Sequence, residues 1–161
     1  DKTYDRAHVM ELPRKPKEFV PVEPPMRRPI GLDDLMQAFK RAKKLNKDAV
    51  QEGLQVITSE LGAMLERDFR IGWGNRLERQ ADDFASVVME AGGTLAEALD
   101  HLLATKVLRK VRDRHDTRPD DLERLKQQLE KAWTKAKLTA VPVKSSVLLE
   151  SEMRRLGRGD E

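Results

Sequence analysis

The sequence predicts an all-α fold: a compact, lid-like bundle of five to six helices, preceded by a short β-strand and a proline-rich linker. Three observations predict it. Charged residues make up 37% of the chain and aromatic residues only 4%, a balance that is typical of helical proteins. From residue 31 onward, apolar residues recur at spacings of three and four, which is the period of an amphipathic helix. The length of 161 residues suits about one domain.

The first 30 residues differ from the rest. Residues 7–12 have the pattern of one short strand, and six of the eight prolines follow between Pro13 and Pro29. Such a stretch is expected to be extended, because proline does not fit a helix interior. A single strand is not stable in water. Residues 1–30 are therefore interpreted as a strand remnant of a missing sheet plus a linker, or alternatively as a disordered tail.

Two helices are expected next, divided at Asn46. The first has an apolar face over residues 32–45, and the second has a longer apolar stripe over residues 50–68. Gly53 and Gly62 should each weaken the second helix by about 1 kcal/mol relative to alanine. They would also let another helix pack closely against it.

A glycine-containing loop at 70–75 leads into a third helix, which Gly92-Gly93 should end. Thr94 and Glu97 have the spacing of a capping box and open a fourth helix. Apolar residues continue through residues 95–111, and this helix is expected to bend or break once before residue 113.

Pro119 suits the first position of a fifth helix, which runs to about residue 137. Its narrow apolar stripe consists of Leu122, Leu125, Leu129 and Trp133. A short last helix, capped by Ser145 or Ser146, should end at Gly157. We therefore expect a helical domain over residues 31–138 and a C-terminal extension over residues 139–161.

Composition excludes several classes of protein. There is no cysteine, so disulfides, a thiolate nucleophile and a cysteine zinc site are all ruled out. No apolar run reaches the length of about 18 residues that a membrane helix needs. The net charge of +3 arises from 31 basic and 28 acidic residues, which indicates a mixed surface. We expect a cytoplasmic protein without a membrane partner.

The chain also lacks the usual parts of phosphoryl transfer. No Gly-x-x-x-x-Gly-Lys-Ser/Thr loop occurs, and the nearest glycine-rich piece is Gly72-Trp73-Gly74. The chain alone is therefore not expected to hydrolyse a nucleotide or to bind a cofactor. The three histidines lie far apart without metal-ligand spacing, so no metal site is expected.

Two groups of basic residues are candidates for contacting phosphates. Lys106, Arg109 and Lys110 would share one face of a regular helix and could bind nucleic acid, although a solvated surface is the simpler interpretation. Arg76 opens a helix after the glycine-containing loop. An arginine held there can reach a phosphate or carboxylate of a partner domain, or can be an ordinary surface residue.

Three segments resemble McrB-like AAA+ NTPases. Residues 1–12, Asp-Lys-Thr-Tyr-Asp-Arg-Ala-His-Val-Met-Glu-Leu, resemble the segment after the sensor-1 strand, where Lys-Val-x-Asp-Arg-Ala-Asn-Val recurs in the family. Phe69, Gly72, Trp73 and Arg76 resemble the sensor-2 region. Residues 98–111 resemble the following lid helix. The resemblance covers roughly residues 1–130.

The resemblance implies that this chain is the end of the large subdomain plus the helical lid of such an NTPase. The missing upstream core would bind ATP or GTP with Mg. Arg76 would be the sensor-2 arginine that contacts the nucleotide, and Arg6 would be an arginine finger acting in trans on a neighbouring subunit of a homo-oligomeric ring. The family works in DNA restriction and phage defence, with a nuclease subunit and DNA as partners.

The residues alone leave two other functions open. The chain could be a free-standing helical module that binds nucleic acid through its basic segment. It could also be a protein-interaction module in which the proline-rich segment is a docking arm.

Overall fold

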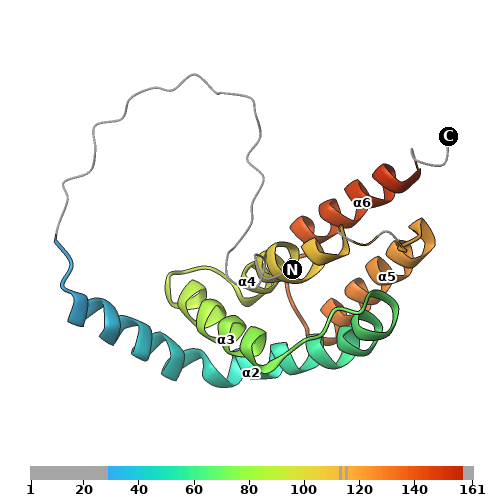
Figure 1. Ribbon diagram of the computed structural model, residues 1–161. Helices are drawn as coiled ribbons and strands as arrows, with labels where there is room; N and C mark the ends of the chain where they lie inside the picture. Colours follow the sequence, from blue (N-terminus) through green and yellow to red (C-terminus); the bar gives the residue numbers. More distant parts are fainter. Residues whose placement is uncertain (1–28, 113, 115, 158–161) are drawn as a thin grey trace.

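The computed structural model describes residues 29–112, 114 and 116–157, and these residues form five α-helices and two irregular helical turns (Figure 1). The predicted all-α bundle is confirmed, with no strand among the described residues. The predicted strand, most of the proline-rich linker and Arg6 lie outside them. The elements are α2 (Leu32–Phe69), α3 (Asn75–Glu90), α4 (Leu95–Leu102), the π-helical η1 (Leu103–Val107), the 3-10 helix η2 (Leu108–Val111), α5 (Pro119–Lys135) and α6 (Val143–Gly157).

Helix α2 runs without interruption for 38 residues, so the predicted division at Asn46 is wrong. The Asn46 side-chain amide donates hydrogen bonds to the carbonyl of Ala42, at 3.1 Å, and to the carbonyl of Ser86 in α3, at 3.3 Å. Its polar group is thereby satisfied by the turn before it and by the neighbouring helix. Asparagine disfavours helices when its side chain bonds to nearby backbone groups in a non-helical conformation, whereas both of these bonds form with the helix intact.

Helix α2 is the long helix against which most of the bundle packs. Helices α3, α4 and α5 pack against it, and α6 packs against α4, α5 and both irregular turns (Figure 1). The predicted apolar stripe of α5 is fully buried, and Leu149 of α6 joins the same core. The segment 139–161 therefore shares the hydrophobic core of the preceding helices over its described part.

The helix ends follow local chemistry. Thr94 Oγ1 accepts from the backbone N–H of Glu97 at 3.2 Å, and Glu97 Oε2 accepts from the backbone N–H of Thr94 at 2.8 Å, which confirms the capping box. Pro119 is the first residue of α5, as predicted. Gly92 follows α3 with φ +92°, a conformation that glycine adopts easily.

Among the described helices, none has the length and apolarity that a membrane span requires.

The start of α6 differs from the prediction. The helix begins at Val143, so Ser145 lies inside its first turn and does not cap it. The cap comes instead from the buried carboxylate of Asp100 in α4. It accepts hydrogen bonds from the backbone N–H groups of Lys144 and Ser145, both at 2.8 Å.

Candidate functional site

Arg76 lies in the first turn of α3, directly after the loop that contains Gly72 and Gly74. Both glycines face open space, because a Cβ atom at either position would have no other atom within 4 Å. Its side chain is exposed, and it has no hydrogen bond or ion pair with any other described residue. The helix that carries it is firmly packed, because Ala81 and Ala85 are buried against the core. The Arg76 guanidinium is thus exposed and is carried by a well-packed helix.

A groove lies beside this arginine, between α2 and α3. It has a volume of about 510 Å³ and is lined by Gln51, Leu54, Gln55, Thr58, Ser59, Glu78, Arg79 and Asp82. Thr58 Oγ1 and Asp82 Oδ1 are buried and have no hydrogen-bond partner among the described residues. The groove therefore offers a hydroxyl and a carboxylate oxygen next to the helix turn that holds Arg76.

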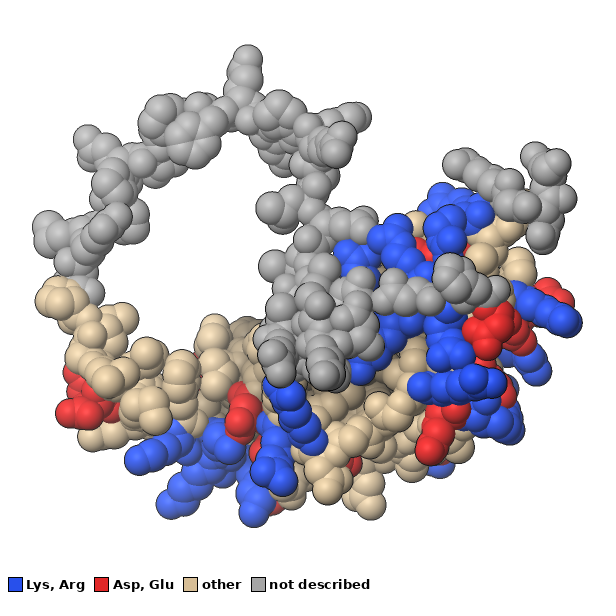
Figure 2. Space-filling model, viewed as in Figure 1, with Lys and Arg blue, Asp and Glu red and all other residues tan. Residues whose placement is uncertain are grey.

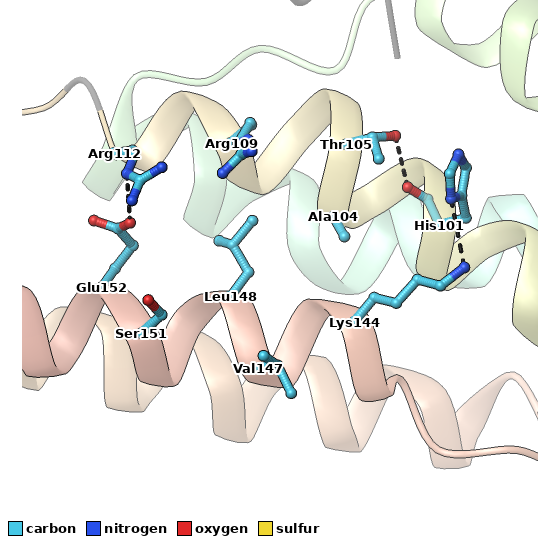
Figure 3. A pocket seen from close by; sticks show the side chains of 10 residues that line it. All are labelled: His101, Ala104, Thr105, Arg109, Arg112, Lys144, Val147, Leu148, Ser151 and Glu152. Atoms are coloured by element: carbon cyan, nitrogen blue, oxygen red, sulfur yellow. Dashed lines mark hydrogen bonds and ion pairs between the residues drawn. The ribbon is translucent and has the colours of Figure 1, made fainter. Parts of the chain in front are cut away.

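A second cavity of about 410 Å³ lies between the irregular turns and α6 (Figure 3). Its polar lining is mainly basic and includes Lys144, Arg109 and Arg112. Glu152, which is only 3% exposed, opposes this charge through ion pairs with Arg112 at 2.8 Å and with Arg155 at 2.6 Å. The carboxylate is held between two guanidinium groups at one end of the cleft.

The wall of this cleft is shaped by the π-helical turn η1. The Thr105 hydroxyl donates to the His101 carbonyl at 2.7 Å, and Lys144 Nζ lies 3.5 Å from His101 Nδ1 (Figure 3). The His101 ring stacks on Phe84 with centroids 5.4 Å apart. The predicted irregularity between residues 95 and 111 is therefore confirmed as a π turn followed by a 3-10 turn. Single π turns are frequent at functional sites.

The predicted basic group is less accessible than a regular helix face would be. Lys106 is 3% exposed and Arg109 is 9% exposed, while Lys110 is half-buried. Arg109 lines the cleft, whereas Arg76 lines neither cavity. Binding of nucleic acid by these residues stays a prediction, and it would require the two buried cations to become accessible.

No sequence pattern pointed to the role of Asp100. Its carboxylate is 6% exposed and holds the start of α6 against α4, which fixes the distance across the cleft. No group of three or more metal-binding side chains occurs among the residues that the structure describes.

No protein-family model, no curated protein and no solved structure matches this chain.

Proposed function

We propose that this chain is the C-terminal, lid-containing part of an AAA+ NTPase motor that uses ATP or GTP and acts in DNA restriction or phage defence. The proposal rests on the resemblance of residues 1–130 to McrB-like NTPases. The structural observation that supports it most is Arg76, which is exposed in the first turn of α3 and has no partner among the described residues.

This position suits a contact with nucleotide phosphates. The first backbone N–H groups of a helix have no partner within the helix, and the helix dipole favours a negative charge there. A guanidinium in the same turn adds a bidentate, charge-assisted contact to phosphate oxygens. Charge that develops during phosphoryl transfer would be stabilised by both.

The proposal assigns the other parts of the machine to partners. An upstream core would supply the phosphate loop and the Mg site, which this chain lacks. Arg6 would act in trans on the nucleotide of the neighbouring subunit in a homo-oligomeric ring. A nuclease subunit and DNA would be the further partners in the cytoplasm.

The test uses the protein that contains this segment together with its phosphate loop. Arg76→Ala should lower kcat by about 100- to 1,000-fold, the range found when one donor to a transition-state charge is removed. Arg79→Ala, one turn further along α3, is the matched control and should retain near-normal turnover. Because Arg76 is exposed and has no hydrogen bond or ion pair with another described residue, the thermal midpoint should not change. Normal turnover of Arg76→Ala would remove the sensor role.

The role of Arg6 is tested by mixing subunits. Arg6→Ala subunits should be inactive alone, because no neighbour supplies the finger. They should regain hydrolysis when mixed with subunits that keep Arg6 but have a disabled phosphate loop. If mixing restores no activity although mixed rings form, Arg6 does not act in trans.

A further inference from the structure

The first part of α2 projects beyond the bundle (Figure 1). Helix α3 begins to cover α2 at Arg41, which pairs with Glu90 at 3.1 Å, and at Ala42, which is 2% exposed. The preceding ten residues, 32–41, form what we call the arm. The arm carries four large exposed apolar side chains: Leu32 at 73%, Leu35 at 40%, Met36 at 47% and Phe39 at 40%.

These four side chains lie on one face of the helix, because they are spaced by three, one and three residues. The same spacing continues into the buried stripe of Val50, Leu54 and Ile57, so the arm extends the core-facing surface of α2 past the end of the core. None of the four side chains belongs to the described core or packs against it. An apolar helix face of this kind is typical of an interaction site.

We propose that the arm pairs in antiparallel fashion with the arm of a second copy of this chain. A two-fold axis between Leu35 and Met36 would place Leu32 against Phe39 of the second copy, and Leu35 against its Met36. In this register the first residue of the second arm, Leu32, lies at the level of Phe39, just before Arg41, where α3 begins to cover α2. The second arm therefore fits on the uncovered part of the helix.

Charge favours this arrangement over a parallel one. Asp33 and Lys40 are seven residues apart and lie on the same flank of the apolar face. Equivalent flanks meet in an antiparallel pair, so Asp33 of each copy would lie beside Lys40 of the other. Neither residue has an ion pair with a described residue, whereas Arg41 and Lys43 already pair with α3. Figure 2 shows acidic atoms at the tip of the arm and basic atoms further along it.

The interface is small, because about ten residues of each copy take part. Contacts of less than about 1,200 Å² in total belong to weak or transient association. We therefore expect a dissociation constant between about 10 µM and 1 mM, and the measurement must reach that concentration. The pairing does not depend on the NTPase proposal.

Sedimentation equilibrium of the 161-residue chain up to about 1 mM tests the pairing. The wild type should pass from monomer to dimer with rising concentration. Phe39→Asp should weaken the dimer by about 100-fold or more, because it places a charge at the apolar contact. Asp33→Lys and Lys40→Asp should each weaken it by about 3- to 10-fold through like-charge contacts. The double variant Asp33→Lys/Lys40→Asp should return to wild-type association, since both cross-copy pairs are restored with reversed sign.

Asp34→Lys is the matched control. It reverses the same charge in the same first helical turn, so its effect on the helix end equals that of Asp33→Lys, but it lies on the face turned away from the contact. It should leave the dimer unchanged, and circular dichroism should show the same helix content in every variant. Three results would each overturn the proposal and assign the arm to a different occupant. The first is a wild type that stays monomeric to 1 mM. The others are equal losses for Asp33→Lys and Asp34→Lys, and no recovery in the double variant.

Discussion

Asp100 Oδ1 accepts a hydrogen bond from the backbone N–H of Ser145 at 2.8 Å, and the Ser145 hydroxyl donates back to the Asp100 carbonyl at 3.3 Å. The two residues are separated by 45 positions, and both are buried. Asp100 Oδ2 takes the neighbouring N–H of Lys144. Two backbone groups that a helix start leaves without partners are thus satisfied by one carboxylate, and the Asp100 side chain links α6 to α4.

Removing this carboxylate should weaken the whole bundle. Asp100→Ala leaves the buried N–H of Ser145 and the partly buried N–H of Lys144 without their acceptor, and we expect the free energy of unfolding to fall by about 3 kcal/mol. Asp100→Asn keeps the shape but offers one acceptor oxygen, so it should lie between the alanine variant and the wild type. Urea unfolding followed by circular dichroism measures both. Asp120→Ala, on an exposed residue of α5, is the control and should change stability by less than about 0.5 kcal/mol.

The two glycines inside α2 should respond oppositely to leucine. A Cβ at Gly53 would lie 2.8 Å from Leu95 Cδ2, so Gly53→Leu should cost about 2 kcal/mol through overpacking against α4. At Gly62 the nearest atom is Thr58 Cγ2 at 3.9 Å, and Gly62→Leu should gain about 0.5 kcal/mol because leucine favours helix. Thermal unfolding of the pair compares the two sites. Equal effects would show that the approach of α4 at Gly53 is not close.

The capping box should make stability depend on acid pH. The backbone N–H and hydroxyl of Thr94 bind the Glu97 carboxylate and lower its pKa below the ordinary value of 4.5. A lowered pKa in the folded state means that this stabilisation is complete above about pH 4.5 and is lost as the pH falls through the folded-state value. Thr94→Ala should therefore cost about 1 kcal/mol at neutral pH and progressively less below pH 4.5.

Chemical unfolding of the wild type and of Thr94→Ala between about pH 7 and pH 3 measures that difference. Glu97→Gln supplies the control background, because glutamine does not titrate, and the cost of Thr94→Ala measured in that background should not vary over the same interval. A gap between the wild type and Thr94→Ala that stays constant down to pH 3 would contradict this explanation.

Features that rest on neighbouring residues were predictable from the sequence. The capping box at Thr94, the start of α5 at Pro119 and the end of α3 at Gly92 each depend on backbone chemistry within a few residues. The position of Arg76 at the start of a helix belongs to the same class, because Gly74 directly precedes α3.

Features that rest on distant residues were not predictable. Asn46 is held in helix by a carbonyl of α3, 40 positions away. The cap of α6 comes from α4, and no local pattern marks it. The burial of Lys106 and Arg109 also could not be foreseen, because charged side chains are seldom covered unless the tertiary fold demands it.

The continuity of α2 has a mechanical consequence. At 1.5 Å per residue, the 38 residues of α2 extend for about 57 Å. The arm and the part of α2 that contributes to the core therefore belong to one continuous helix. Helix α3 begins to pack against α2 at Ala42, so a bending movement of the arm would turn about this residue. A force on the arm would therefore act on α3, in part through the hydrogen bond between Asn46 and Ser86. Helix α3 is also the helix that presents Arg76 in its first turn.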